Sequence, residues 1–506
     1  MTGAPATTGH RRHWVRLDNA SNIFPAALSE RDPKVFRMAA ELDHEVDSAL
    51  LQEALDETYA RYPLYRAVLR RGVFWYYLQD STLHPRVEPE REHTCAPIYR
   101  TDHRTLLFRV THHGRRVNLE TFHALSDGTG ALWFLTDLLT AYVRRLDGRD
   151  GQGGREDPSA DGGADHERTG SAAHPDPAPA RAGTHPGAEA AEEVHELTTD
   201  SFAHYFRRRR GRDRAPSAED EEGEFEREAA PAVLTVRDPE EPEEGALEAD
   251  APPPRPERGR VFHVRGPRTP DFRPRLVELT MPVGPVLALA KSEGVAMTMY
   301  LTAMFFEAIR RSAPSAEHAA MAASVPVNLR QFFPSTSARN FFATIRVAHR
   351  YRAGEDDAVG AVARALQEDF ALEATPAALA QKLHRLIRVE RLPVARVVPR
   401  PLKDVLLGLI NHANNSSLTV AVSNLGRVTL PPEVEAHVGR MFFHVSAVRP
   451  QFCAISHAGQ LTISFTSPFT AVDHVREYVR MLAEAGADVQ VAVPKVTERE
   501  LTWGAP

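Results

Sequence analysis

Phe122-His123-Ala124-Leu125-Ser126-Asp127-Gly128 is an H-x-x-x-D-G pattern, and the residues on its two sides differ in periodicity. Before it, residues 116–122 alternate as in a strand. After it, apolar residues recur at helical spacing: Leu132, Leu135, Leu138, Leu139 and Tyr142. The sequence therefore predicts that a strand ends near His123 and that a helix begins just beyond it.

The residue types of this pattern suit proton transfer. Imidazole is the side chain best matched to removing a proton from a hydroxyl near neutral pH. Asp127 comes one tight turn later, where a carboxylate can lock the turn, and Gly128 and Gly130 leave room for close backbone approach. The alternative is that His123 is a hydrogen-bonded histidine of the core and Asp127 an ordinary acid at a helix N-terminus.

Residues 13–147 carry the patterns of a folded unit. Residues 46–62 place apolar side chains on one side of a helix, with Asp47 in an acidic first turn. Two hairpins are expected around this helix and the motif: residues 63–69 with 73–78, and residues 105–111 with 116–122.

Residues 148–260 differ in composition from the rest of the chain. They are rich in Gly, Ala, Pro and charged residues, with acidic runs such as Glu219-Asp220-Glu221-Glu222. Such a stretch buries too little apolar surface to offset chain entropy. We expect a long disordered insertion, with the pattern for one helix at residues 194–209.

Ordered patterns return in residues 261–506. Helices are expected at 282–293, from a cap at Thr298 through Ile309, at 356–372 and at 472–485; strands are expected at 325–329, 344–351, 418–423 and 442–448, with a hairpin at 452–465. Strands interleaved with helices on both sides of the insertion predict the α+β class, with two lobes that are each a two-layer sandwich.

Composition excludes several functions. The net charge of −7 offers no basic field for a nucleic acid. Two cysteines, Cys95 and Cys453, are too few for a disulfide framework or a thiolate zinc site, so a reducing compartment is expected. His112 and His113 have no third ligand at suggestive spacing, so no metal site is expected. Residues 1–13 contain no apolar signal segment, and no stretch of transmembrane length occurs, so we expect a cytoplasmic protein.

The motif resembles that of the chloramphenicol acetyltransferase-like superfamily, which includes condensation domains, wax ester synthases and alcohol acetyltransferases. Further segments are similar to bacterial alcohol acetyltransferase-type proteins: Leu17-Asp18-Asn19-Ala20, Phe24-Pro25, Arg71-Gly72-Val73-Phe74-Trp75-Tyr76-Tyr77, Pro326-Val327-Asn328-Leu329-Arg330 and Ser423-Asn424-Leu425-Gly426. They lie on both sides of the insertion. Phe122 departs from the condensation-domain form, which has a second histidine at this position.

The resemblance implies two similar lobes forming a V around a central tunnel. His123 is then the general base, and Asp127 points away from the tunnel and braces the loop through an arginine, for which Arg66 is our candidate. Ser423 or Asn424 would donate to a developing oxyanion, or form an ordinary turn. Asn328 and Arg330 would shape the tunnel or pair with a neighbouring loop.

The activity implied is acyl transfer from a thioester to a small alcohol. Acyl-CoA is the expected co-substrate by family likeness, and no metal or redox cofactor is expected. One alternative is a condensation-like enzyme that forms an ester or amide from an acyl-carrier protein. The other is a non-catalytic member of the fold that binds a lipid or a protein.

Overall fold

The computed structural model describes residues 14–18, 21–153, 260–269, 271–391 and 397–495. The expected disordered insertion, at residues 154–259, and the helix expected at 194–209 lie outside this part of the chain. Residues 148–153 continue the helix that begins at Gly128, so the predicted insertion begins too early in the chain.

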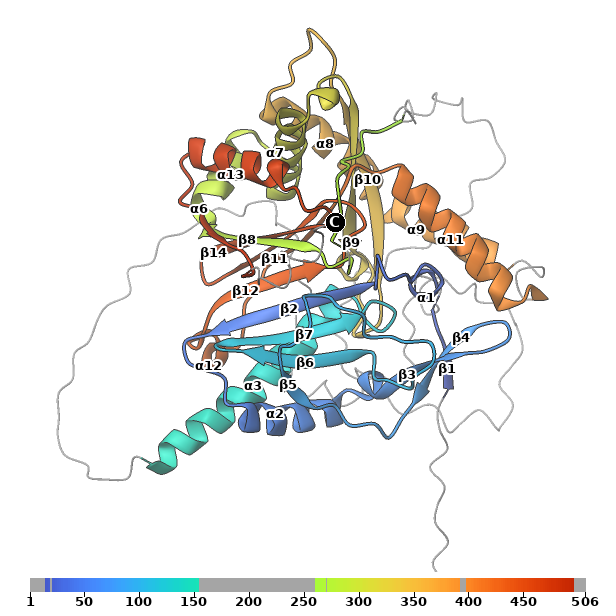
Figure 1. Cartoon of the computed structure of the whole chain (residues 1–506), viewed down its shortest axis with the longest axis vertical. Helices are drawn as coiled ribbons and strands as arrows, with labels where there is room; N and C mark the ends of the chain where they lie inside the picture. The colour runs from blue at the N-terminus through green and yellow to red at the C-terminus, as the bar shows by residue number, and fades with distance from the viewer. Residues whose placement is uncertain (1–13, 19–20, 154–259, 270, 392–396, 496–506) are drawn as a thin grey trace, which may run out of the picture. The chain divides into compact units, whose positions relative to one another are not determined.

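Three sheets organise the described residues (Figure 1). The three-stranded sheet has the order β1 (Trp14–Arg16), β4 (Tyr76–Asp80), β3 (Ala67–Arg71). The five-stranded sheet has the order β12 (Val438–Val445), β2 (Val35–Leu42), β7 (Arg116–Phe122), β6 (Phe108–His113), β5 (Val87–Pro89). The seven-stranded sheet has the order β10 (Phe342–Arg350), β9 (Ala320–Asn328), β11 (Val420–Arg427), β13 (Gln451–His457), β14 (Gln460–Ser467), β8 (Arg275–Pro282), β15 (Gln490–Ala492).

The helices of the described residues form two groups by their place in the sequence. The N-terminal group is α1 (Ile23–Ala26), α2 (Ser48–Arg61) and α3 (Gly128–Gly153). The C-terminal group is α6 (Val283–Ser292), α7 (Met297–Ser312), α8 (Val359–Glu373), α9 (Pro376–Arg391), α11 (Arg400–Ser416), α12 (Pro432–Glu435) and α13 (Asp473–Glu484). The described residues also form 3-10 helices at Pro63–Arg66, Pro314–Ala316 and Leu329–Gln331. The predicted α+β class with two sheet-and-helix lobes is confirmed.

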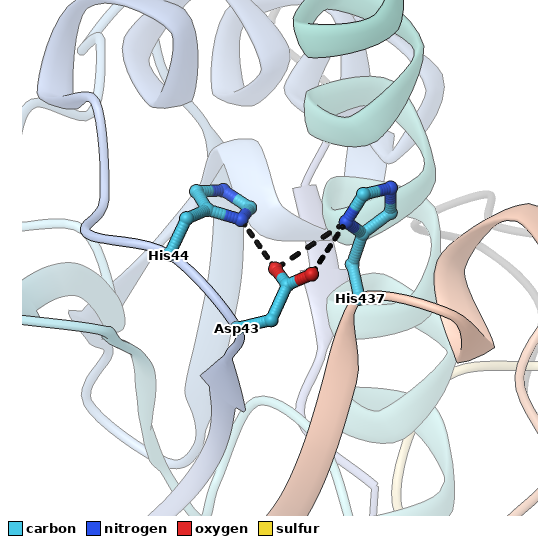
Figure 2. A group of neighbouring side chains, drawn as sticks. All are labelled: Asp43, His44 and His437. Carbon is cyan, nitrogen blue, oxygen red and sulfur yellow. Dashed lines mark hydrogen bonds and ion pairs between the residues drawn. The ribbon is translucent and has the colours of Figure 1, made fainter.

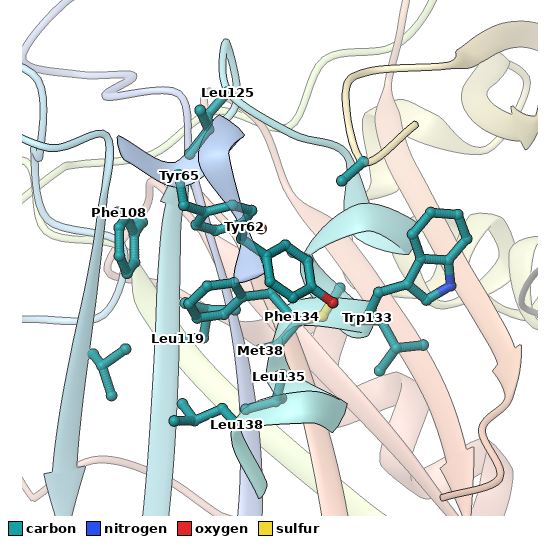
Figure 3. Packing of buried hydrophobic residues seen from close by; sticks show 14 of the residues in the cluster. Met38, Tyr62, Tyr65, Phe108, Leu119, Leu125, Trp133, Phe134, Leu135 and Leu138 are labelled. Atoms are coloured by element: carbon teal, nitrogen blue, oxygen red, sulfur yellow. The ribbon is translucent and has the colours of Figure 1, made fainter. Parts of the chain in front are cut away.

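Each large sheet has its own hydrophobic core. In the N-terminal lobe, α2 and α3 pack together, and Phe134 of α3 stacks on Tyr65 with ring centroids 4.1 Å apart (Figure 3). Phe108 of β6 packs edge-on against the Phe134 ring. In the C-terminal lobe, Phe305 of α7 and Tyr478 of α13 both pack on Phe465 of β14. Two separate cores explain why the chain exceeds the size that a single core organises.

One strand crosses between the two halves of the sequence. β12, from the C-terminal half, pairs antiparallel with β2 and forms an edge of the N-terminal sheet. α12, which precedes it, packs on α3. The predicted lobe of residues 261–506 therefore needs a correction, because residues 432–445 belong structurally to the N-terminal lobe.

Two local predictions around the motif need smaller corrections. The strand expected at residues 63–69 begins as a 3-10 helix, Pro63–Arg66, because Pro63 supplies its first position, and only Ala67–Arg71 is a strand. The turn between β6 and β7 lies at Gly114 and Arg115, with Gly114 at φ +53°, so that His112 and His113 end β6. The hairpins themselves are present.

Candidate functional site

His123 lies at the predicted junction between a strand and a helix. β7 ends at Phe122, and α3 begins at Gly128. The backbone N–H of His123 donates to the carbonyl of Lys34 at 2.8 Å, and the N–H of Leu125 donates back to Phe122 at 2.9 Å. These two bonds fix the turn against β2, so the position of the imidazole is set by the sheet.

Three aromatic rings surround the His123 imidazole. Phe24 of α1 stacks on it with centroids 4.3 Å apart and planes 8° apart, Phe36 meets it edge-on at 5.0 Å, and Phe342 lies tilted at 5.5 Å. Burial among these rings lowers the pKa of His123 below 6.5, although the Asp127 charge and a hydrogen bond to Asn340 act in the opposite direction. The residue is nevertheless partly exposed, unlike Phe122 and Ala124 beside it.

Asn340 determines which ring nitrogen of His123 carries the proton. Its Nδ2 donates to the His123 carbonyl and to Ser21 Oγ, both at 2.7 Å. This orientation turns the Asn340 Oδ1 toward His123 Nδ1, 3.3 Å away. Because Oδ1 can only accept, Nδ1 carries the hydrogen and the lone pair is on Nε2. Within the described residues Nε2 has no hydrogen-bond partner.

Sequence reasoning missed Asn340. It lies 217 residues beyond His123 and belongs to no local pattern. Its neighbour Arg339 forms a buried ion pair with Asp18 at 3.1 Å, and the Asp18 carboxylate also accepts from the N–H of Ser21 at 2.8 Å. Asp18, in the Leu17-Asp18 segment, thus holds the residue next to Asn340 in place. The acid at position 18 is the sequence signal that points to this contact.

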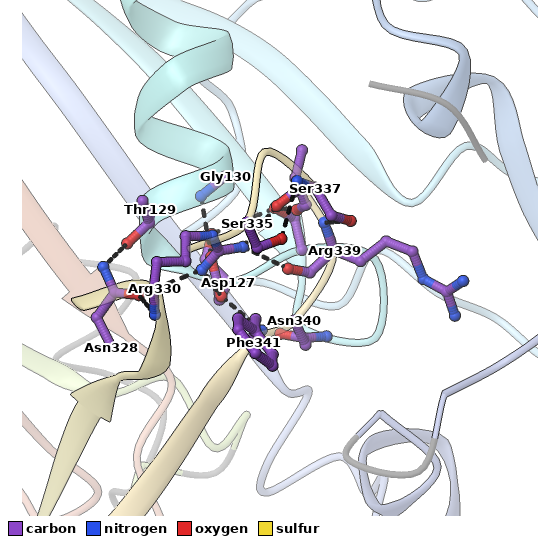
Figure 4. A network of polar contacts seen from close by, with 12 residues as sticks. Asp127, Thr129, Gly130, Asn328, Arg330, Ser335, Ser337, Arg339, Asn340 and Phe341 are labelled. Carbon is purple, nitrogen blue, oxygen red and sulfur yellow. Dashed lines mark hydrogen bonds and ion pairs between the residues drawn. The ribbon is translucent and has the colours of Figure 1, made fainter. Parts of the chain in front are cut away.

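The Asp127 carboxylate is turned to the backbone and braces the loop (Figure 4). Its Oδ1 accepts from the N–H of Gly130 at 2.9 Å, which caps α3. Its Oδ2 accepts from the N–H of Phe341 at 2.8 Å and from Arg330 Nη1 at 2.7 Å. Asp127 therefore ties the motif to the loop that carries Asn340.

The predicted partner of Asp127 was wrong. Arg66 ends a 3-10 helix and donates from Nη2 to the carbonyl of Ala60 at 2.6 Å. The arginine that binds Asp127 is Arg330, 203 residues away in sequence. Arg330 lies in the 3-10 helix that follows β9, so the other lobe supplies the partner of Asp127.

Arg330 and Asn328 form the second side of this network. Arg330 Nη2 donates to the carbonyls of Ser337 and Arg339, each at 2.7 Å. Asn328 accepts from the N–H of Arg330 at 3.0 Å and donates to Thr129 Oγ1 at 3.1 Å. Of the two alternatives for Asn328, the structure thus displays pairing with neighbouring segments, and its assignment to substrate stays a prediction.

The glycines of the motif differ in what they allow. A Cβ on Gly130 would lie 2.2 Å from the carbonyl oxygen of Ala338 and 2.5 Å from Ser126 Oγ, so only glycine fits there. A Cβ on Gly128 would meet the flexible tip of Leu425 at 3.0 Å. Close approach is therefore a strict requirement at Gly130 and a milder one at Gly128.

Ser423 and Asn424 lie on β11, whose end reaches the start of α3 through Leu425. The Asn424 amide donates to Thr298 Oγ1 at 2.9 Å, and its oxygen accepts from the N–H of Gly426 at 2.8 Å. Thr298 was expected to cap a helix, but α7 begins at Met297 without a side-chain cap. β11 pairs in register with β13 at Ser423 and Asn424, and the register shifts between Asn424 and Arg427.

The tunnel expected from the resemblance stays a prediction. One surface hollow is lined by residues of α2 and of the segment 80–87, and it includes Arg66. A second is lined by Glu30, Cys95, Phe272 and their neighbours. Neither contains His123. In the described part of the chain, no helix has the length and apolarity needed to cross a membrane.

Comparisons with known proteins bear on the fold. No protein-family model and no curated protein sequence matches the chain. Among solved structures, TRI101 of F. graminearum, complexed with coenzyme A and deoxynivalenol, is similar with a TM-score of 0.56 at 11% identity, over 94% of this chain and 99% of that one. The TRI3 trichothecene 15-O-acetyltransferase of Fusarium sporotrichioides is similar with a TM-score of 0.53 at 10% identity, over 95% and 96%.

A condensation domain is also similar. The starter condensation domain of rhizomide synthetase RzmA, in complex with C8-CoA and Leu-SNAC, has a TM-score of 0.50 at 10% identity, over 94% of both chains. The chain therefore has the fold shared by acetyltransferases and condensation domains, which is the fold of the chloramphenicol acetyltransferase-like superfamily.

Proposed function

We propose that the protein transfers an acyl group from a thioester, acyl-CoA, to an alcohol, with His123 as the general base. The observation that carries this proposal is the state of the imidazole. Asn340 holds the hydrogen on Nδ1, Nε2 is without a partner within the described residues, and burial lowers the pKa, so the neutral base is the dominant form near pH 7.

The proposed reaction balances without a cofactor. Nε2 of His123 takes the proton of the acceptor hydroxyl, and the hydroxyl oxygen bonds to the thioester carbonyl carbon. The carbon–sulfur bond then breaks, and the imidazolium returns the proton to the leaving thiolate. The products are an ester and free CoA. Because both substrates react directly, no covalent acyl-enzyme is required.

Support for these substrates comes from the similar structures. TRI101 was crystallised with coenzyme A, and the name of TRI3 describes transfer to an oxygen. For the oxyanion that forms on the thioester carbonyl, Ser423 is the better candidate donor. The Asn424 amide already donates to Thr298, whereas Ser423 is half-buried and carries a hydroxyl that can donate.

Substitution of His123 tests the proposal. The variant His123→Ala should keep its circular dichroism spectrum and lose activity by roughly 10²- to 10⁴-fold in an assay of thiol release from acyl-CoA with a panel of alcohols. His103→Ala is the matched control, because His103 is exposed and pairs with Asp102 at 3.3 Å, away from the motif. Turnover by His123→Ala equal to that of the control would remove His123 from the mechanism.

The condensation-domain likeness supports one alternative, a donor tethered to a carrier protein. Kinetics with the same acyl group on CoA and on an acyl-carrier protein separate the two. We expect a lower KM for acyl-CoA. A much lower KM for the carrier-bound donor would favour the alternative, and saturable ligand binding without turnover on any donor would favour a non-catalytic protein.

A further inference from the structure

Asp43, His44 and His437 form a cluster that is separate from the acyl-transfer site (Figure 2). One ligand atom from each residue lies within 4.8 Å of the others. His44 Nδ1 is 2.5 Å and His437 Nδ1 is 3.2 Å from the Asp43 carboxylate. All three side chains reach solvent, with Asp43 55% exposed. We propose that these three residues bind a divalent transition metal ion such as Zn²⁺.

The spacing of the ligand atoms fits such an ion. With Zn–N and Zn–O bonds of roughly 2.0–2.1 Å, neighbouring ligands of a tetrahedral site lie about 3.3 Å apart. The His437 Nδ1–Asp43 distance of 3.2 Å is already close to this value. The His44 Nδ1–Asp43 distance of 2.5 Å would have to increase by less than an ångström, and the two histidine ligand atoms lie within 4.8 Å of each other. Imidazole and carboxylate together select Zn²⁺ and its neighbours over Ca²⁺ or Mg²⁺. Water would complete the coordination from the exposed side.

Both histidines also face a polar group on the ring nitrogen that points away from the ion. His44 Nε2 is within hydrogen-bond distance of the Tyr142 hydroxyl, at 3.2 Å, and His437 Nε2 lies 3.8 Å from the Asp147 carboxylate, an ion-pair distance. Tyr142 and Asp147 both belong to α3. Metal-binding histidines usually have this kind of support, which sets the tautomer and the ring orientation. An incidental Asp–His pair such as Asp102–His103 has no second histidine.

The cluster lies where the C-terminal strand joins the N-terminal sheet. Asp43 follows the end of β2, His437 precedes the start of β12, and the N–H of Asp43 donates to the carbonyl of His437 at 3.0 Å. A bound ion would connect the ends of these strands and, through Tyr142 and Asp147, the helix α3. Its role would be structural, and the site is independent of the proposed acyl transfer.

Metal titration of the full chain tests this proposal. After treatment with a chelator, Zn²⁺ binding is measured by calorimetry, and Co²⁺ binding by its visible absorption. His437→Gln and His44→Gln should each weaken the site at least about tenfold, and Tyr142→Phe should weaken it by roughly 10-fold to 100-fold. His103→Gln, in a surface Asp–His pair, is the matched control and should leave it unchanged.

Two results would overturn the proposal. One is the absence of saturable Zn²⁺ binding by the wild-type chain. The other is equal binding by His437→Gln and His103→Gln, which would assign the metal to other histidines of the chain. A melting temperature that rises with Zn²⁺ for wild type and for His103→Gln, but not for His437→Gln, would support the structural role.

A second, independent observation concerns the outer face of α11. Leu402, Val405, Leu406 and Leu409 are spaced as one face of a helix, and each is 58–62% exposed. Val73 and Phe74, at the tip of the β3–β4 hairpin, add exposed apolar surface. The hairpin and the helix are joined, because Arg400 N donates to the Val73 carbonyl at 2.8 Å and Lys403 Nζ to the Phe74 carbonyl at 3.0 Å.

The charges around this apolar face are predominantly basic. Arg70 and Arg71 are exposed on the hairpin, and Arg400 and Lys403 lie at the start of α11. Asp404, an acid on the same helix, pairs with Arg400 at 3.5 Å and accepts from the Tyr76 hydroxyl at 2.9 Å, so the excess positive charge comes from Arg70, Arg71 and Lys403. Apolar side chains bordered by cations are typical of a surface that lies on an anionic membrane. We infer that α11 and the hairpin tip bind an anionic lipid surface.

Vesicle co-sedimentation tests this second inference. The full chain should bind vesicles of phosphatidylcholine mixed with phosphatidylglycerol and bind pure phosphatidylcholine less. Leu406→Glu should reduce binding by about tenfold or more, because a charge replaces an exposed leucine that would enter the lipid. Leu372→Glu, at an exposed leucine of α8, is the matched control and should bind like wild type.

Several outcomes would refute the lipid surface. Wild-type protein that does not sediment, or Leu406→Glu that sediments as well as Leu372→Glu, would do so. A wild-type dimer that Leu406→Glu alone converts to a monomer, measured by light scattering, would assign the face to a second copy of the chain instead.

Discussion

Arg330 and Asp127 form a buried ion pair at 2.7 Å that joins the strand-to-helix loop of one lobe to the 3-10 helix after β9 in the other. Each side chain is less than a tenth exposed. The pair holds together the two segments that carry His123 and Asn340, so the position of the base depends on an arginine that does not contact it.

Removing this arginine should destabilise the protein. Arg330→Met leaves the Asp127 carboxylate buried without its cation, and such changes cost about 3–5 kcal/mol of unfolding free energy. Urea unfolding measures the loss. Arg476→Met, which removes an exposed pair with Asp473, should change stability by less than about 0.5 kcal/mol. Equal stability of the two variants would contradict the bracing role.

Gly130 and Gly148 provide a matched pair of positions in one helix. Gly130→Ala should lower the free energy of unfolding by about 2 kcal/mol or more, because the new Cβ would lie 2.2 Å from the Ala338 carbonyl oxygen. Gly148→Ala meets nothing within 4 Å and should stabilise α3 by about 0.5–1 kcal/mol. Thermal unfolding of both variants distinguishes steric conflict from helix propensity.

The pH profile of acyl transfer should reflect the lowered pKa of His123. Burial disfavours the imidazolium and lowers the pKa of His123, so at pH 6.5 the imidazole is neutral in more than half of the molecules. The value of kcat/KM should therefore stay high at pH 6.5 and fall only below it, as the pH passes through the lowered pKa. A fall centred well above pH 6.5 would show that another group controls the rate.

Asn340→Asp extends this test. A carboxylate at Nδ1 favours the imidazolium, so the acid limb should move to higher pH. Asn414→Asp, on the surface of α11, should leave the limb in place. A merely structural role for Asn340 would lower the rate without moving the limb.

Glu278 should make stability depend on acid. Burial alone would raise its pKa, but hydrogen bonds with His444 and Arg116 outweigh burial and lower the pKa from 4.5 to about 2. Because the folded-state pKa is lowered, the stabilisation is complete above pH 4.5 and is lost as the pH falls toward 2. Urea unfolding at pH 5 and pH 3 should show a smaller loss for Glu278→Gln than for wild type; equal losses would contradict this.

The sequence predicted helices and strands correctly where the signal came from residues close together in the chain. The change of period around His123 predicted the junction, and Asp47 predicted the start of α2, where it caps two backbone N–H groups. Val35–Leu42 gave no strand signal, because nearly all of its residues are buried and it lacks the alternation of a half-exposed strand. α11 was missed because its apolar face is outside, contrary to the usual pattern.

Only the residues of the site that are close together in the sequence were predicted correctly. His123, Asp127 and the glycines share one segment, and their arrangement follows from it. Arg330 was named but not matched to Asp127, and Asn340 was missed, because both meet the motif only after the two lobes have packed. The same holds for Asp43 and His437, whose residues meet only when β12 joins β2. Contacts of this kind leave no periodic trace in a single sequence.

The pairing of β12, from the C-terminal half, with β2 also has a consequence for biosynthesis. Val35 and Ser446, whose backbone and hydroxyl meet beside the β2–β12 ladder, are 411 residues apart. At a translation rate of roughly 5–20 residues per second, the ribosome needs on the order of a minute to make the strand that covers β2. During that time the nascent chain presents an open sheet edge to the cell, and premature termination before residue 438 would leave that edge permanently available for aggregation.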